Sequence, residues 1–453
     1  TRATSSLTRA AATWSRCASA AKSRGRARGV SIRNLDEAEA AVREVLALEN
    51  PRDQLRRMPL LVAQCLDAEA RAFLEKHLKP KGSAPASRDR VNMLEKAKAW
   101  QKTKAENKFA QITWPEEWGG RGGTAMQSVI WGQEESKFDA PTGPFAIGLG
   151  MCVPTVIAFG SDEHKKRYVQ KALMGEEIWC QLFSEPSAGS DVAGLKTRAV
   201  KDGDEWVING QKVWTSGAHY SDFGILLVRT DPKVPKHKGL TMFIVNMKQP
   251  GVEVRPIHQA SGGREFNEVY FTDVRIPDSD RLGDVGAGWK VALVTLMNER
   301  LAVGGSPGPD WGEIMEYARS QGTLSDQAFR EKLADWYVAA QGYKLTKFRT
   351  QTALSRGQTP GPENSIGKII TANHLQDICN SAIEMQDHYG IINESDRMPA
   401  DAIFQQSFMW APGLRIAGGT DEILKNIIAE RVLGLPQDVR VDKDKPFDEM
   451  KSG

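Results

Sequence analysis

Glu299 is the acidic residue whose sequence surroundings most suggest chemistry. We expect a helix to begin near Trp289, and at about 100° per residue Glu299 then lies within about 80° of an apolar stripe. The residues of that stripe are Trp289, Ala292, Leu296 and Val303. Burial among apolar side chains raises a carboxyl pKa, so that the carboxylate becomes a competent proton acceptor near neutral pH. A structural ion pair or a boundary charge would explain the same position, and the helix alone favours that plainer interpretation.

Residues 182–191 combine small side chains with hydroxyl groups in a way that suits a bound ligand. Gly189 lets the backbone approach a flat or charged group closely, and the hydroxyls of Ser184 and Ser190 can bind heteroatoms. Taken alone, however, this segment is only a turn.

Two further segments have both a structural and a functional interpretation. Residues 209–216 form a turn into a strand that presents Trp214 and Ser216, although a tryptophan on a strand more often belongs to a core. In residues 417–423, two glycines precede Thr420, a candidate N-cap for the helix that follows. The free N–H groups at such a helix start suit an anion or a polar ligand edge, but a plain helix cap explains the pattern equally well.

Basic residues are concentrated at the start of the chain. The 453 residues carry a formal net charge of +3, yet eight basic residues precede the first acidic one, Asp36. The remaining 52 Lys and Arg stand against 57 Asp and Glu, a net charge of −5, which excludes a nucleic-acid-binding body on charge grounds. The first ~30 residues have the composition of a mitochondrial transit peptide and predict the mitochondrial matrix. A basic tail, or an upstream start in a bacterial gene and hence the bacterial cytoplasm, is the alternative.

Cysteine usage and hydropathy exclude several other classes of protein. The five cysteines are scattered and form no Cys-x-x-Cys pair, so neither a disulfide framework nor a metal site is predicted. The longest uncharged run, residues 140–161, contains three prolines and four glycines. We therefore expect a buried helix there and no transmembrane segment.

The hydrophobic periodicity changes twice along the chain and predicts an α+β multidomain protein. A helical period governs the first part, short β-prone segments with turn signals follow from Trp179, and the helical period returns by Trp289. The expected parts are a basic segment (1–34), an N-terminal helical domain (35–178), a central sandwich-like or barrel-like β domain (179–283) and a C-terminal helical domain (284–453).

In this order, the segments resemble the acyl-CoA dehydrogenase family over about residues 112–435. The matching stretches read WPEEWGG from Trp114, FGSDEHKKRY from Phe159, FSEPSAGSDVA from Phe183 and INGQKVWTS from Ile208, with GGTDEI following Ala417. The resemblance implies a flavoprotein whose C-terminal domain is four-helix-bundle-like. It also implies that FAD-dependent oxidation converts an acyl-CoA thioester to trans-2-enoyl-CoA, and that electrons pass to electron-transferring flavoprotein. A homodimer or homotetramer is expected.

The resemblance also assigns residues to the cofactor. It places Gln181, Phe183, Ser184 and Ser190 beside the flavin, with Trp214 and Ser216 flanking its ring. Thr420 and Glu422 match positions that contact the adenosine part, and Gln386 and Gly390 approximate a loop that reaches FAD from a neighbouring subunit. For the substrate, the resemblance implies contacts from Ser190 and Arg300, and an acyl pocket lined by residues 145–154. Gly148 and Gly150 there suggest room for a long, branched or cyclic acyl group.

The chain departs from the majority of the family at Gly418, where many members carry the catalytic glutamate directly before Gly-Thr. A minority, including the isovaleryl-CoA and long-chain types, place the base on a helix that carries Glu-Arg, which matches Glu299 and Arg300. The resemblance thus implies Glu299 as the base, with a backbone N–H of Gly418 for the thioester carbonyl. Residues 318–322 lack the Phe-Gly that follows an arginine in many members, which puts a pyrophosphate role for Arg319 in doubt.

Three rival functions remain open. An acyl-CoA oxidase would use the same flavin and base with O₂ as acceptor, and the sequence does not separate it from a dehydrogenase. A non-catalytic partner subunit of a hetero-oligomeric dehydrogenase would explain the glutamate missing at Gly418, although the retained Glu299, Ser184 and Trp214 argue against it. A flavin monooxygenase would not need a glutamate on the apolar helix face.

Overall fold

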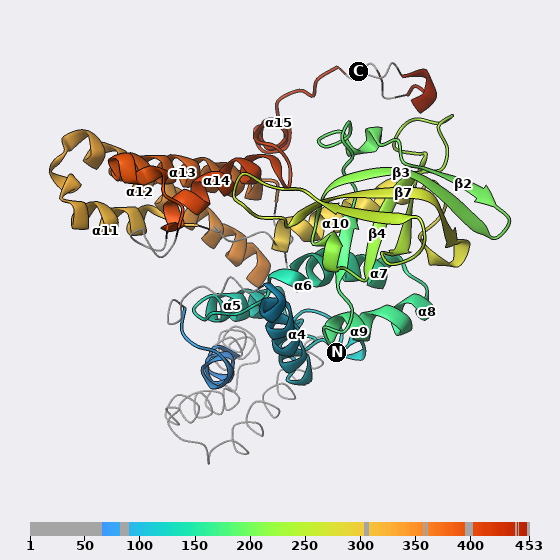
Figure 1. The fold of residues 1–453 in the computed structure, drawn as a ribbon, viewed down its shortest axis with the longest axis horizontal. Helices are drawn as coiled ribbons and strands as arrows, with labels where there is room; N and C mark the ends of the chain where they lie inside the picture. The colour runs from blue at the N-terminus through green and yellow to red at the C-terminus, as the bar shows by residue number, and fades with distance from the viewer. Residues whose placement is uncertain are drawn as a thin grey trace, which may run out of the picture. The chain divides into compact units, whose positions relative to one another are not determined.

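The computed structural model describes residues 66–81, 90–302, 308–356, 358, 361–394, 402–439, 442 and 444–450 (Figure 1). The predicted basic segment, residues 1–34, and the start of the expected N-terminal domain therefore lie outside the described residues. The chain divides into two compact units. One comprises Thr1–Pro144 and Leu173–Glu176, and the other comprises Phe145–Ala172 and Glu177–Gly453.

The first unit is helical and is built around aromatic side chains. Residues 66–77 form a helix, and α4 (Arg90–Glu106), the 3-10 turn η1 (Glu116–Trp118) and α5 (Ala125–Glu135) follow. Phe73, Phe109 and Trp131 lie in the core, where the ring centroids of Phe109 and Trp131 are 4.6 Å apart. Burial of these large rings supplies much of the hydrophobic stabilisation of the unit.

A run of short helices precedes the sheet. They are α6 (Gly143–Ile147), the π-helical turn η2 (Gly148–Cys152), α7 (Val153–Phe159), α8 (Asp162–His164), the π-helical turn η3 (Lys165–Val169) and α9 (Gln170–Leu173). Pro154 is tolerated in the first turn of α7, where its missing N–H removes no helical hydrogen bond. The expected buried helix in residues 140–161 is thus present, but it is interrupted by the turn η2.

One eight-stranded sheet forms the middle of the second unit. Its strands are β1 (Trp179–Leu182), β2 (Arg198–Asp202), β3 (Glu205–Ser216), β4 (Phe223–Arg229), β5 (Leu240–Asn246), β6 (Val252–Pro256), β7 (Phe266–Pro277) and β8 (Arg281–Leu282). The order is β6-β7-β3-β2-β4-β5-β8, and β1 pairs in parallel with β4. The side chains of β4 and β5 are almost continuously buried, as expected for central strands that are covered on both faces.

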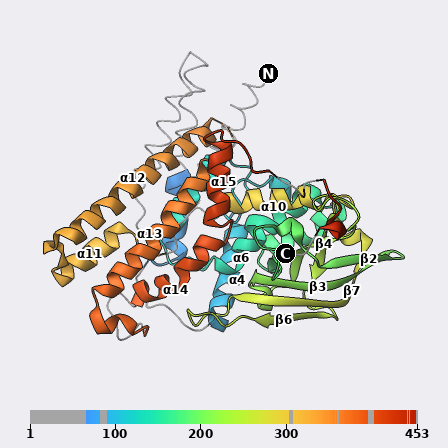
Figure 2. The same cartoon turned by 90° about the horizontal axis from the view of Figure 1, so that it is seen from above.

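Helices return after the sheet. They are α10 (Gly288–Ala302), α11 (Trp311–Gln321), α12 (Gln327–Ser355), α13 (Asn364–Glu384), α14 (Ile403–Ile416) and α15 (Asp421–Arg431). Figures 1 and 2 show α11 to α14 running side by side, and they share one apolar core that includes Ile314, Trp336, Leu375 and Phe404. The predicted α+β class and its order of helical, β and helical parts are therefore confirmed.

Candidate active site

The first candidate segment follows β1. Gln181 is half-buried on that strand and Phe183 is 4% exposed just beyond its end. Glu185 and Ala188 then exchange two backbone hydrogen bonds, of 3.1 and 3.0 Å, which close a tight turn. Ser184 is half-buried before the turn and Ser190 is exposed after it. The hydroxyl of Ser190 therefore faces solvent.

The second candidate segment contains a strained tryptophan. The pairing of β3 with β7 shifts register between Lys212 and Thr215, and Trp214 takes the left-handed φ of 59°. Such a backbone costs an L-residue about 1–2 kcal/mol, and it persists only where neighbouring contacts over-determine it. The result is a large ring that is 59% exposed, with an edge-on contact to Phe266 at 6.1 Å. A strained aromatic residue at the surface suits a flat aromatic ligand.

The structure joins these two segments. The N–H of Val213 donates to the Ser184 carbonyl at 2.9 Å, and Lys212 Nζ donates to the Phe183 carbonyl at 3.0 Å. Phe183 and Ser184 therefore lie beside Trp214 and the strand that ends at Ser216. No acceptor for the Ser184 N–H is found among the described residues.

Lys212 and Glu185 form an ion pair beneath this surface, with 2.8 Å between Nζ and Oε1 and 0% and 5% of their side chains exposed. Burial lowers the pKa of Lys212 to about 8, against the opposing effect of Glu185. Burial also opposes ionisation of Glu185, but the charge of Lys212 and the hydrogen bonds to the carboxylate outweigh it and lower the pKa of Glu185. The pair is thus a buried charged element of the site.

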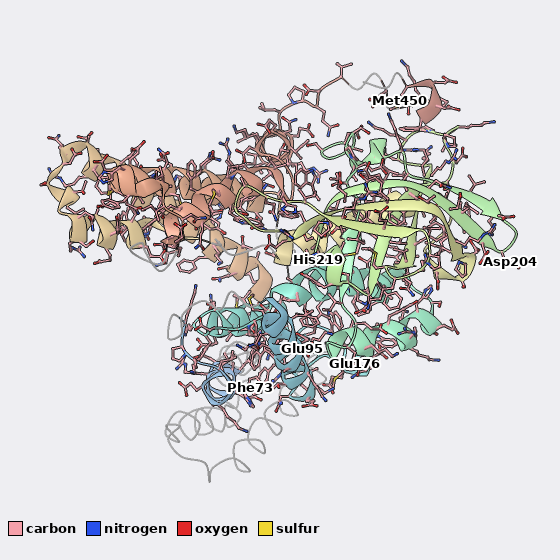
Figure 3. All side chains as sticks on the ribbon, viewed as in Figure 1. Phe73, Glu95, Glu176, Asp204, His219 and Met450 are labelled. Atoms are coloured by element: carbon pink, nitrogen blue, oxygen red, sulfur yellow. The ribbon has the colours of Figure 1, made fainter. Side chains whose placement is uncertain are left out.

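A second buried polar residue fixes the strand after the register shift. Asn267 is 0% exposed, and its Nδ2 donates to the Thr215 carbonyl at 2.8 Å. His219, labelled in Figure 3 and part of the 3-10 turn η5 (Ala218–Tyr220), has Nδ1 at 3.1 Å from Asn267 Oδ1. These bonds hold the backbone on the carboxyl side of Trp214.

Helix α10 has one buried face over the residues that precede position 299. Val291, Ala292 and Thr295 are 0% exposed, whereas Leu293 and Met297 are 44% and 56% exposed. Glu299 lies one turn beyond Thr295 on the same backbone face, and Arg300 follows Leu293 and Met297 along the opposite one. Both residues belong to α10, and their side chains lie outside the described residues.

The expected acyl-pocket segment packs against this helix. The hydroxyls of Thr155 on α7 and Thr295 on α10 are 2.9 Å apart and fully buried. The preceding turn η2 is π-helical, a feature that occurs frequently at functional sites. Within η2, a Cβ added at Gly148 would lie 3.2 Å from the Cβ of Trp179, so glycine allows close packing on β1.

The loop before α15 is anchored from several directions. Gly418 and Gly419 have φ angles of 63° and 96°, which glycine adopts at little cost. Lys368 donates to the Gly419 carbonyl, and Thr420 Oγ1 accepts from the Ile423 N–H at 3.2 Å. The buried Asp421 accepts from Arg415 Nε at 2.8 Å. The predicted N-cap is therefore present at Thr420.

Glu422 lies beside that cap and is exposed. Hydrogen bonds from its own backbone N–H and from the Thr420 hydroxyl lower its pKa, so it stays ionised at neutral pH.

Gln386 and Gly390 lie in another part of the helical core. Gln386 is 7% exposed, accepts a hydrogen bond from Gln405 Nε2 and has no partner for its own Nε2 among the described residues. Gly390 is buried in the 3-10 turn η8 (Asp387–Ile391). The Gln386 side chain thus faces the bundle of its own chain, and the structure does not bring it together with Ser184 and Trp214.

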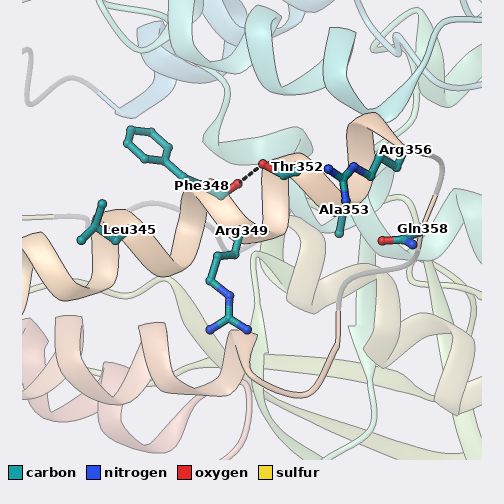
Figure 4. A pocket seen from close by; sticks show the side chains of 7 residues that line it. All are labelled: Leu345, Phe348, Arg349, Thr352, Ala353, Arg356 and Gln358. Carbon is teal, nitrogen blue, oxygen red and sulfur yellow. Dashed lines mark hydrogen bonds between the residues drawn. The ribbon is translucent and has the colours of Figure 1, made fainter.

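Other candidate sites lie apart from these residues. An open hollow of about 470 Å³ lies along the end of α12 and beyond (Figure 4). It is lined by Leu345, Phe348, Arg349, Thr352, Ala353, Arg356 and Gln358, none of which belongs to the predicted site.

Within the described ranges, no group of three or more His, Cys, Asp or Glu residues could hold a metal ion. No helix in that part of the chain is long and apolar enough to cross a membrane.

Comparison with known sequences matches most of the described residues. The profile of the acyl-CoA dehydrogenase N-terminal domain matches residues 63–176, that of the middle domain residues 180–274 and that of the C-terminal domain residues 286–433. The chain belongs to the acyl-CoA dehydrogenase family. It is accordingly an acyl-CoA dehydrogenase, an oxidoreductase whose cofactor is FAD, and the predictions of family, enzyme class and cofactor are confirmed.

Two relatives come from Mycobacterium tuberculosis. This acyl-CoA dehydrogenase is 38% identical to acyl-CoA dehydrogenase FadE34 over 72% of its own length, and it spans only 44% of that relative's length. It is 36% identical to acyl-CoA dehydrogenase IpdE1, over 77% of this chain and 90% of the relative. These relatives are bacterial, so the mitochondrial expectation gains no support from them.

Two solved structures are also similar. The steroid acyl-CoA dehydrogenase Tcur3481-Tcur3483 matches with 28% identity and a TM-score of 0.70, covering 83% of this chain and 98% of that one. The ChsE4-ChsE5 complex of Mycobacterium tuberculosis matches with 27% identity and a TM-score of 0.67, over the same shares.

The residues present fit an FAD site, because an exposed tryptophan and an unpartnered backbone donor lie side by side where the resemblance places the flavin. Sequence reasoning missed three polar residues behind that surface, Glu185, Lys212 and Asn267, and it also missed Lys368, which anchors the loop before α15. One signal was available for two of them, since Glu185 and Lys212 each stand inside a matched motif.

Proposed function

We propose that this acyl-CoA dehydrogenase oxidises the Cα–Cβ bond of an acyl-CoA thioester with Glu299 as the catalytic base. The observation that carries the proposal is the buried face of α10 formed by Val291, Ala292 and Thr295, and helix periodicity puts position 299 one turn beyond Thr295. A carboxylate on such a face meets little water, which raises its proton affinity toward that of an effective base. Packing of α10 against α7 through Thr155 brings that helix to the expected acyl segment.

Each residue then has a defined task. The carboxylate of Glu299 removes the α-proton, and the backbone N–H of Gly418 donates to the thioester carbonyl, which stabilises charge on that oxygen. Ser184 and Ser216 bind the edge of the flavin and Trp214 packs on its ring. Thr420 and Glu422 bind the adenosine part of FAD, and Arg300 contacts the CoA part of the substrate. FAD, when bound, accepts the β-hydrogen as hydride.

For the substrate, we propose a bulky ring-containing acyl group of the steroid type. Likeness to a protein named as a steroid acyl-CoA dehydrogenase supports this class, at 28% identity over nearly the full length of that chain. Gly148 adds nothing to this support, because a Cβ there would lie 3.2 Å from the Cβ of Trp179, so this glycine serves the packing of η2 on β1. Straight short acyl groups would fill a pocket built for a bulky ring system poorly and lose contact area.

For partners, we propose electron-transferring flavoprotein as electron acceptor and an oligomeric enzyme. The expectation of a homodimer or homotetramer stands beside a hetero-oligomer, because two similar solved structures carry names with two components. Sedimentation of the FAD-loaded chain separates these assemblies: an active homo-oligomer supports the first, and an inactive chain that gains turnover with a second subunit supports the other. The mycobacterial relatives favour the bacterial cytoplasm over the mitochondrial matrix.

The test is turnover of a panel of acyl-CoA thioesters by the FAD-reconstituted chain. We expect anaerobic conversion to the 2-enoyl product, detected by mass as the loss of two hydrogens, with electron-transferring flavoprotein or an artificial dye as acceptor. Steroid-type thioesters should react faster than straight short ones. Turnover that requires O₂ would establish the oxidase instead, and bound FAD without conversion of any thioester would favour the non-catalytic subunit.

A further inference from the structure

The ion pair between Lys212 and Glu185 links the two segments that carry the flavin residues. Lys212 Nζ lies 2.8 Å from Glu185 Oε1 and 3.0 Å from the carbonyl oxygen of Phe183. Glu185 also accepts from the backbone N–H groups of Lys196, at 2.6 Å, and Thr197, at 2.9 Å. Three donors therefore converge on one buried carboxylate.

A pair this deeply buried is a poor device for stability alone. Removing two charges from water is expensive, and apolar residues of similar volume often stabilise a fold as well or better. Lys212 has 0% of its side chain exposed and Glu185 5%, so the desolvation is nearly complete. A better explanation is that the pair orients the backbone that it bonds, in particular the peptide group between Phe183 and Ser184.

The hydrogen bond to Phe183 fixes the orientation of one peptide group. In a trans peptide the C=O of one residue and the N–H of the next point to opposite sides. Because Lys212 binds the Phe183 carbonyl on the buried side, the N–H of Ser184 points the other way, and no acceptor for it is found among the described residues. The next carbonyl, that of Ser184, accepts from Val213 at 2.9 Å, directly before Trp214.

We propose that Lys212, held by Glu185, is a positioning residue that aims the Ser184 N–H at the edge of the bound flavin ring. The inference rests on the proposed function, because it takes Ser184 and Trp214 as part of the flavin site. A fixed N–H donor at the ring edge stabilises the negative charge that arrives with the electrons. The pair thereby raises the reduction potential of the bound cofactor in addition to its affinity.

The double variant Lys212→Met with Glu185→Gln tests this role. Lys212→Met alone would leave the Glu185 charge buried without its partner, whereas the double variant removes both charges together. The amide oxygen introduced at position 185 can still accept from one of the two backbone N–H groups, those of Lys196 and Thr197, which bond different oxygens of the carboxylate. The matched control is Thr241→Val, which removes a fully buried hydrogen-bonding group from β5 of the same sheet, bonded to Thr230 and Gly286.

Three quantities are compared: the unfolding temperature of the apoprotein, the FAD dissociation constant by calorimetry, and the midpoint potential of the bound flavin. We expect both variants to lower the unfolding temperature. Only the double variant should weaken FAD binding, by tenfold or more. It should also shift the two-electron equilibrium at least tenfold toward the oxidised form, a potential lower by about 30 mV.

A double variant that matches the control in stability and the wild type in FAD affinity and potential would overturn the proposal. If the double variant does not fold, Glu185→Gln alone serves as the test, because it weakens the bond that holds Lys212. A smaller shift of the flavin potential in the same direction supports the proposal. An unchanged potential overturns it. A wild-type chain that binds no FAD would contradict the proposed flavin site itself. A wild-type chain with normal FAD and an unaffected variant contradicts only the positioning role.

Discussion

Two regions of the site use left-handed backbone, one at a tryptophan and the other at two glycines. At the end of β3 the left-handed residue is Trp214, with φ 59°, whereas before α15 the left-handed residues are Gly418 and Gly419, with φ 63° and 96°. Buried polar bonds from Lys212 and Asn267 surround the tryptophan. The glycines adopt these φ angles at little cost, so the bonds that anchor their loop, such as that from Lys368 to the Gly419 carbonyl, need not hold a strained residue.

The difference separates two ways of presenting a group to a ligand. Beside β3 the sheet holds a strained residue in place, as expected if the side chain of Trp214 packs on the flavin ring as proposed. Before α15 the proposed group is the backbone N–H of Gly418, which needs no side chain, so strain is avoided. A base at position 418 would require a strained glutamate on that loop, whereas position 299 lies on a regular helix.

Replacing Trp214 by glycine should break the first half of this comparison and have the largest effect on FAD binding. Glycine accepts φ 59° freely, so the apoprotein should be stabilised by up to about 1–2 kcal/mol while losing the stacking surface. FAD binding should weaken by about tenfold. Calorimetric unfolding and FAD titration check the two opposite changes. Trp214→Phe keeps an aromatic ring and the strained backbone, so it should retain the wild-type stability and FAD affinity. A glycine variant with unaltered FAD affinity would contradict the stacking role.

The reciprocal change is Gly418→Glu in a Glu299→Gln background. A glutamate at φ 63° should cost about 1–2 kcal/mol of unfolding free energy, yet restore part of the turnover with an altered preference among acyl groups. Gly418→Ala in the same background is the control for strain, with equal destabilisation and no regained turnover. Denaturant unfolding and steady-state assays measure both, and a double variant no more active than Glu299→Gln alone would be the contrary result.

Thr420→Ala sharpens the comparison at the loop before α15. Thr420 Oγ1 accepts from the Ile423 N–H at 3.2 Å, and loss of an N-cap costs about 1 kcal/mol. We expect reduced stability together with weaker FAD binding, because the same hydroxyl is proposed to contact adenosine. Thr420→Ser keeps the cap and should behave as wild type in thermal unfolding and FAD titration. Unchanged FAD affinity in the alanine variant would remove Thr420 from the cofactor site.

Thr295→Val should have the smallest effect. Its hydroxyl lies 2.9 Å from that of Thr155, and each hydroxyl also bonds a carbonyl of its own helix. When one hydroxyl is removed, the remaining one therefore keeps a hydrogen-bond partner. We expect a loss of less than about 1 kcal/mol in unfolding free energy and a modest fall in kcat. A double-mutant cycle with Thr155→Val measures the coupling, and Thr295→Ser is the control. Additive effects would show that this bond does not place α10.

The sequence predicted more of the helical part of the site than of the sheet part. The N-cap at Thr420 was predictable because caps follow from local sequence, whereas the position of Glu299 on the buried face of α10 stays a prediction from helix periodicity. The left-handed Trp214 was not predictable, since it arises from the register shift between β3 and β7, which depends on residues more than fifty positions apart. Lys212 was missed for a related reason: a lysine on a strand normally points to solvent, and only its partner Glu185 makes burial possible.

Gln386 and Gly390 stay predictions as residues that reach FAD from a neighbouring subunit. Within its own chain Gln386 is 7% exposed and bonds Gln405. Spacing specifies the distance along the chain, but this burial is decided by how α13 and α14 pack.

The most direct test of the account is single-turnover reduction of the bound flavin in Glu299→Gln. The variant keeps the shape of the side chain but cannot accept the α-proton, and a positioned base contributes ~10²–10⁴-fold. Mixed anaerobically with saturating thioester in stopped flow, the variant should bind FAD and substrate as the wild type does, while its flavin bleaches at least a hundredfold more slowly. Bleaching at the wild-type rate would contradict the account and require another base.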